Sequence, residues 1–227
     1  MIKKMTQYLL QRRCALSLLL MLVLLQPVMA QIQDPIMYAR LNRETQTLTL
    51  YYDTKIDYWL DRLIVDNQSL WLDGSERKKI KTVVFDESFK HARPKSCDQW
   101  FYLFGGLTKI EHLDYLNTSE VENMGSMFSN CTSLETLDLS SFNTEKVTNM
   151  SEMFVGSTNL RTINLPKGFI GSSVTDLNGM FRGCASLTEL DLSGSNAEKV
   201  KNMGSMFYGC VALSNLNLSW SESTYFL

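Results

Sequence analysis

The chain has 227 residues, a formal net charge of −2 and only two histidines. This charge balance offers no basic surface for nucleic acid or for an anionic membrane, and two histidines supply few candidate general bases for an enzyme. The length is sufficient for one or two small domains.

The first thirty residues have the layout of a secretory signal peptide, which we expect to be cleaved before Gln31. Four basic residues precede an apolar run from Cys14 to Leu25, and small residues follow Pro27. The alternative is a membrane-anchoring helix, but the run is shorter than the roughly 20 apolar residues that span a bilayer. Without residues 1–30 the chain has 18 Lys and Arg against 24 Asp and Glu, a net charge of −6. A secreted or cell-surface location is therefore predicted.

Residues 31–79 precede the repeats described below and are expected to form an N-terminal β cap. Tyr38–Leu41 and Thr47–Tyr52 are typical strands, and the polar segment Asn42–Gln46 between them predicts a β-hairpin. The hairpin would cover the first coil, because an open solenoid end exposes apolar surface.

A methionine-rich hexapeptide, Asn-Met-Gly-Ser-Met-Phe, occurs at residues 123–128 and again at 202–207. Related hexapeptides begin at Asn149 and Asp176, which gives four copies at intervals of 26, 27 and 26 residues. Periods of this size are typical of solenoids. Residues 80–227 are thus predicted to form a leucine-rich-repeat-type solenoid of the α/β class, in which the last coil is incomplete.

Each repeat contains two apolar patterns. Leu134, Leu137 and Leu139 have the form L-x-x-L-x-L, which ends in the alternation of a short strand with one buried face. Six such segments lie between Ile80 and Leu218, and we expect them to form one parallel sheet. The second segment, Leu107, Ile110 and Leu113, is slightly expanded.

The second pattern predicts one short helix per coil. Val147, Met150, Met153 and Phe154 are spaced as the apolar stripe of about two helical turns. Two residues after each Phe stands a residue that tolerates the left-handed conformation at a helix end: Asn130, Gly156, Gly183 and Gly209. Apolar spacing assigns the methionines to the core, where their flexible side chains fill irregular gaps; a methionine metal site is the alternative.

Four cysteines follow the leader. Cys131, Cys184 and Cys210 share one repeat position, with Ser157 at the second copy, which predicts a buried column of small side chains. Because secreted proteins often contain disulfides, a bridge between Cys184 and Cys210 is an open alternative.

No catalytic or cofactor site is predicted. His91 lies in a polar stretch and His112 interrupts the expanded strand, and the sequence has no Gly-rich phosphate loop, H-E-x-x-H motif or zinc-spaced cysteine pair. A carboxylate pair for glycoside hydrolysis stays possible.

The outward strand positions predict a polar ladder on one face of the solenoid. Solenoids present such faces as docking platforms, although a hydrated sheet face is the plainer interpretation. The predicted protein-binding residues are Thr136, Asp138, Thr162, Asn164, Glu189, Asp191, Asn215 and Asn217.

The repeat pattern S-x-M-F-x-x-C-x-x-L-x-x-L-x-L-S-x-F-N-T-x-x-V-x-N-M, from Ser126 to Met150, resembles the leucine-rich repeats of BspA-like bacterial surface proteins. Thr47–Asp53, Thr82–Phe85 and Trp100-Phe101 are similar to the segment that often precedes these repeats. The resemblance covers roughly residues 36–220. It implies secretion and binding to extracellular or host proteins, with no shared catalytic residues. A structural spacer within a longer surface array and a secreted hydrolase are the alternative functions.

Overall fold

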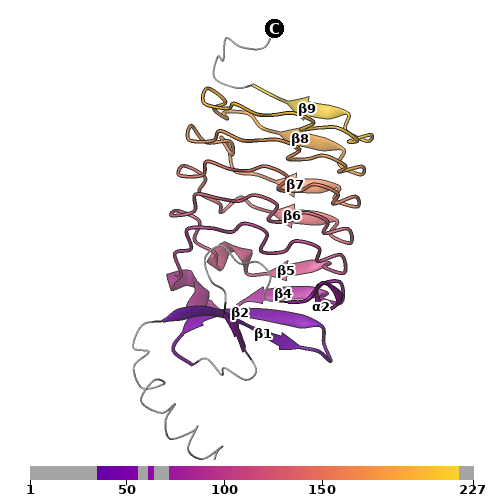
Figure 1. Cartoon of the computed structure of the whole chain (residues 1–227). Coiled ribbons are helices and arrows are strands. Elements are labelled where there is room, and N and C mark those ends of the chain that lie inside the picture. The colour runs from indigo at the N-terminus through magenta and orange to yellow at the C-terminus, as the bar shows by residue number, and fades with distance from the viewer. Residues whose placement is uncertain (1–34, 56–60, 64–71, 220–227) are drawn as a thin grey trace, which may run out of the picture. The chain divides into compact units, whose positions relative to one another are not determined.

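The computed structural model describes residues 35–55, 61–63 and 72–219 (Figure 1). The predicted signal peptide and the residues from Trp220 onward lie outside the described residues. The elements are β1 (Ile36–Asn42), β2 (Thr47–Asp53), β3 (Asp61–Leu63), α2 (Gly74–Arg77), β4 (Thr82–Phe85), the 3-10 helix η1 (Glu87–His91), β5 (Lys109–Glu111), the 3-10 helix η2 (Leu113–Tyr115), β6 (Thr136–Asp138), β7 (Thr162–Asn164), β8 (Glu189–Asp191) and β9 (Asn215–Asn217).

The N-terminal hairpin is confirmed and covers the first coil. β1 and β2 pair antiparallel, and the turn is closed by the Asn42 Oδ1 atom, which accepts the backbone N–H groups of Glu44 and Thr45. β2 then pairs in parallel with β4, with Leu48 opposite Val83. The hairpin therefore continues the sheet of the coils, and the additional strand β3 pairs with the outer side of β1.

A buried arginine completes the cap. Arg77 is 2% exposed; its Nη1 atom donates to the carbonyl of Tyr102 at 3.2 Å, and its Nε atom donates to the carbonyl of Leu72 at 2.8 Å. The equivalent carbonyl one coil later, that of Ser129, accepts the N–H of Leu103 from the preceding coil. Arg77 thus replaces the donor that a preceding coil would have supplied.

The predicted helix in each coil is wrong, because the hexapeptides form consecutive tight turns. The fourth residue of every hexapeptide has a left-handed backbone: Ser126 (φ 50°), Glu152 (φ 55°), Gly179 (φ 60°) and Ser205 (φ 57°). A left-handed residue cannot continue a right-handed helix, and between residues 116 and 219 the structure contains no helix. The spacing of Val147, Met150, Met153 and Phe154 misleads because two four-residue turns place the same positions on one face.

Alternate N–H groups of these turns donate to the next coil instead of to their own segment. The N–H groups of Met124, Ser126, Phe128 and Asn130 donate to the carbonyls of Asn149, Ser151, Met153 and Val155 at 2.7–2.9 Å. The same pattern joins each later hexapeptide to its successor. The predicted left-handed residues after each Phe are confirmed, from Asn130 (φ 58°) to Gly209 (φ 79°), but they end a turn and not a helix.

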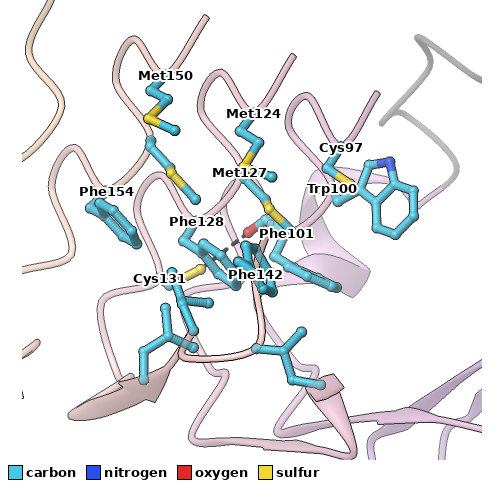
Figure 2. Close-up of a cluster of buried hydrophobic side chains, with 14 of the residues drawn as sticks. Cys97, Trp100, Phe101, Met124, Met127, Phe128, Cys131, Phe142, Met150 and Phe154 are labelled. Carbon is cyan, nitrogen blue, oxygen red and sulfur yellow. Dashed lines mark hydrogen bonds between the residues drawn. The ribbon is translucent and has the colours of Figure 1, made fainter. Parts of the chain in front are cut away.

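The interior is a stack of similar layers, and the methionines lie in it as predicted, although Met203 of the last hexapeptide is only partly buried. Met124, Met127, Met150 and Met153 are all fully buried, and Figure 2 shows Met124 and Met150 above Phe128 and Phe154. The rings of Phe101, Phe128, Phe154, Phe181 and Phe207 stack face to face, with centroids 5.2–5.8 Å apart. The first residue of each hexapeptide also has a role: Asn123 Oδ1 accepts the N–H of Gly125 at 2.8 Å and closes the turn.

The cysteines form the predicted column as free thiols. Cys97, Cys131, Cys184 and Cys210 are all unbridged. The Sγ atoms of Cys131, Cys184 and Cys210 each donate to a phenylalanine carbonyl of the preceding coil at 3.0–3.2 Å, and the Ser157 hydroxyl donates in the same way at 2.7 Å. Burial raises the pKa of Cys184 to about 12 and raises the pKa of Cys131 and Cys210 as well.

The six predicted strands are present and parallel, but they do not form one sheet. β4 pairs with β5, β6 with β7, and β8 with β9, and the strand pairing is interrupted after β5 and after β7. The interruption after β5 follows from the expanded segment. His112 has a left-handed backbone (φ 57°) and the chain then enters η2, and β5 does not pair with β6. The interruption after β7 coincides with the extra residue of the Pro166–Gly168 loop.

Glycine substitution distinguishes the turns from a helix. Ser126→Gly should raise the free energy of unfolding by about 0.5–1 kcal/mol. A left-handed conformation costs an L-residue roughly 1–2 kcal/mol, which glycine avoids, but the greater conformational entropy of glycine in the unfolded chain offsets part of this stabilisation. In a helix the same change would destabilise the protein. As the control of opposite sign, Gly156→Ala should destabilise it, since φ is +69° there and the new Cβ would lie 2.5 Å from Asn130 Oδ1. Urea unfolding of the three proteins provides the measurement.

Thiol labelling tests the free cysteine column. In denaturant without reductant, Cys97, Cys131, Cys184 and Cys210 should all react, whereas a bridge between Cys184 and Cys210 would leave two of them unlabelled. In the native protein Cys210 should react first because it is only partly buried. Cys131 and Cys184 should stay unlabelled even at mildly alkaline pH, since their raised pKa values keep them protonated. Mass spectrometry of the digested protein assigns the sites.

Candidate functional site

The eight predicted binding residues all lie exposed on the strand face. They are brought together in two in-register groups. On β6 and β7, Thr136 lies opposite Thr162 and Asp138 opposite Asn164. On β8 and β9, Glu189 lies opposite Asn215 and Asp191 opposite Asn217. The interruption between β7 and β8 separates the groups, so the continuous ladder expected from the sequence is divided.

Four of these residues already have a structural role. Asp138, Asp191 and Asn217 each accept, through Oδ1, the N–H of the serine two residues later, at 2.8–3.2 Å. These hydrogen bonds close the turn at the end of the strand. Asn164, which is followed by Pro166 without an N–H group to bind, donates instead from Nδ2 to Asp138 Oδ1 at 3.0 Å.

The turn hydrogen bonds also set the charge of the ladder. The N–H of Ser140 lowers the pKa of Asp138, and the N–H of Ser193 lowers the pKa of Asp191. Both carboxylates therefore stay ionised at neutral pH. In the other row Thr136, Thr162, Glu189 and Asn215 make no side-chain hydrogen bond or ion pair within the described residues, so this row is available to a partner.

A groove lies where β5 and β6 fail to pair. Its volume is about 350 Å³, and it is lined by residues 108–110 and 112–114 on one side and by residues 136–138, 140 and 141 on the other. Figure 1 shows β5 and β6 farther apart than β6 and β7. Thr136 and Asp138 of the predicted ladder form one wall. Sequence reasoning missed the groove, although the expanded spacing of Leu107, Ile110 and Leu113 was its signal.

Neither histidine lies in a catalytic arrangement among the described residues. His91 is exposed at the end of η1. His112 is exposed and stacks on the ring of Tyr115, with centroids 4.8 Å apart. In the same described ranges no group of three or more His, Cys, Asp or Glu residues could hold a metal ion. No helix there is long and apolar enough to cross a membrane.

Comparison with solved structures finds bacterial leucine-rich repeat proteins. A leucine-rich repeat protein from Bacteroides ovatus is 18% identical, with a TM-score of 0.40; the match covers 83% of this chain and 53% of that protein. A leucine-rich cell surface protein from Faecalibacterium prausnitzii is also 18% identical, with a TM-score of 0.37 and coverages of 81% and 53%. The chain therefore spans about half the length of the solved structures that it matches. None of the curated proteins is significantly similar to it.

Two family models match the chain itself. Residues 167–225 match a family described as a Mycoplasma protein of unknown function. Residues 76–175 match the BspA-type leucine-rich repeat region, in six copies. The second match contains β4 to β7, together with the first two hexapeptides and their phenylalanines. Residues 76–175 of this chain thus resemble a BspA-type leucine-rich repeat region.

Proposed function

We propose that this chain is a non-catalytic binding module of the bacterial cell surface or extracellular medium, and that its ligands are extracellular or host proteins. One observation carries the proposal: the strand face displays polar side chains in register on successive coils. Regular stacking makes this face a flat, pre-organised surface, and solenoids use surfaces of this kind to contact other proteins.

The chemistry of the described residues supports a binding role over a hydrolytic one. A nucleophilic mechanism needs a nucleophile, a base and an orienting group within hydrogen-bond reach. The thiols that could serve as nucleophiles are buried and donate to backbone carbonyls, and their pKa values are raised and not lowered. The two carboxylates of the ladder that carry turn hydrogen bonds are ionised, whereas a glycosidase needs one carboxylic acid that keeps its proton.

The leader and the comparisons support an extracellular location. The first thirty residues have the pattern of a secretory signal peptide, and the matched protein from Faecalibacterium prausnitzii is a cell surface protein. A structural spacer is the second candidate. It is favoured by the short, hydrated side chains of the ladder, which are poor binding hot spots without aromatic or arginine anchors.

Binding to purified proteins separates the two candidates. The chain should bind at least one member of a panel of purified extracellular-matrix proteins in biolayer interferometry. Thr162→Lys combined with Glu189→Lys should weaken that binding about tenfold or more, because the substitutions add bulk and reverse a charge at the centre of the face. Both positions lack turn hydrogen bonds, so the coils should stay folded.

Glu198→Lys is the matched control. It makes the same charge change as Glu189→Lys on the same coil but lies in the loop after the strand, and it should leave binding unchanged. Equal binding by the strand-face variant would show that another surface makes the contact. No binding to any panel member, at concentrations where adhesive modules respond, would favour the spacer.

A further inference from the structure

The groove between β5 and β6 exists because one coil has a longer strand segment than the others. Leu107, Ile110 and Leu113 are spaced by three and three residues, whereas Leu134, Leu137 and Leu139 are spaced by three and two. The extra residue puts His112 in a left-handed conformation and directs the chain into η2. The turns on the other side of the same two coils remain joined: Phe101 still donates to the carbonyl of Met127 at 2.9 Å. The coils therefore open on the strand face alone.

Where the coils open, one backbone carbonyl lacks the N–H group that the next coil supplies at the other strands. At the start of the other strands, the carbonyls of Lys81, Glu135, Arg161 and Thr188 each accept an N–H group from the next coil, at 2.8–3.4 Å. Thr108 occupies the equivalent position in the expanded coil and lines the groove. Within residues 72–219 its carbonyl accepts no backbone N–H group. Nearby side chains bind elsewhere, since the hydroxyls of Thr132 and Ser133 donate to the carbonyl of Gly105.

The walls of the groove carry an excess of negative charge. Asp114 from η2 and Asp138 from β6 both line it. The one lysine in the lining, Lys109, is already paired with Glu111, with Nζ and Oε1 2.6 Å apart. Asp138 Oδ1 accepts the N–H of Ser140 and an Nδ2 hydrogen of Asn164, and the carboxylate remains exposed on the groove wall. A ligand that supplies several N–H donors and a positive charge would satisfy both carboxylates and the Thr108 carbonyl.

The floor of the groove is apolar. Leu113 and Leu137 are 7% and 5% exposed, and Ile110 is partly buried beside them. A floor of this kind suits the aliphatic stem of a long side chain whose charged head reaches polar groups. Arginine combines such a stem with a planar head that carries five donors, and it is among the residues most enriched at interface hot spots.

We propose that this groove is the anchor subsite of the strand face and that it binds an arginine side chain of the partner protein. The inference rests on the proposed binding function and specifies its chemistry. It supplies the anchoring pocket that the flat polar ladder lacks.

A peptide titration tests the subsite directly. Acetyl-Gly-Arg-Gly-amide is added to the 15N-labelled secreted chain (residues 31–227), and amide chemical shifts are followed by NMR. Amides of residues 108–114 and 136–141 should shift in a saturable manner. The same peptide with citrulline, which is neutral and nearly isosteric with arginine, should bind at least about tenfold more weakly, because the charge-assisted hydrogen bonds are lost.

The variant Asp114→Asn/Asp138→Asn removes the two negative charges but keeps an acceptor for the N–H of Ser140, as Asn217 does for Ser219 in its own coil. It should lose the arginine response while its other amide shifts stay in place. The matched control, Glu145→Gln/Glu198→Gln, removes two exposed charges from loops outside the groove and the strand face and should respond as the parent does. Shifts of equal size with citrulline, an unchanged response in the groove variant, or no shift at residues 108–114 would each overturn the subsite.

The outcome is separable from that of the proposed function. If the chain binds a matrix protein through the strand face and Asp114→Asn/Asp138→Asn binds it equally well, the function stands and the arginine subsite is refuted. If the arginine peptide binds the groove but no matrix protein is captured, the subsite stands and the proposed function fails. Shifts at the groove caused by neutral oligosaccharides and not by the arginine peptide would assign the groove to another ligand class and refute the proposal.

Discussion

The fold depends on the backbone hydrogen bonds that join each turn segment to the next coil. Because alternate N–H groups from Met124 to Asn130 donate to the following coil, successive coils are held at one spacing and in one register. The phenylalanine stack, the methionine layers and the cysteine column follow from that register, since identical positions are placed above one another. Left-handed residues make this possible by directing N–H groups away from their own segment.

The same register explains why a polar face appears on the other side of each coil. Short strands repeat the order exposed, buried, exposed, so each exposed position stands beside its equivalent on the paired strand. Where one coil has an extra residue, as before His112, the turn side keeps its hydrogen bonds and the strand side separates. A one-residue change in spacing thus converts part of a flat face into a groove, which is the feature that gives the face a place for an anchor.

Much of this arrangement could be predicted from the sequence, because the apolar positions specify it directly. The hairpin of Tyr38–Leu41 and Thr47–Tyr52, the buried methionines and the exposed strand positions follow from the sequence pattern alone. The turn segments could not be assigned in the same way, since Val147, Met150, Met153 and Phe154 fit a helix and a pair of turns equally well. The position of Glu152 shows why: glutamate favours helices, yet here it adopts φ 55°. The interruption of the sheet after β5 and the lack of a backbone donor to the Thr108 carbonyl depend on how two neighbouring coils separate. No single repeat contains that information.

Hydrogen-bond scalar couplings measured by NMR test the backbone hydrogen bonds between successive turn segments most directly. They report which carbonyl carbon lies across the hydrogen bond from a given amide nitrogen. A doubly labelled protein should show couplings from the nitrogens of Met124, Phe128 and Asn130 to the carbonyl carbons of Asn149, Met153 and Val155, one coil away. Couplings from the Phe128 nitrogen to the Met124 carbonyl carbon, four residues earlier, would identify a helix and contradict the account.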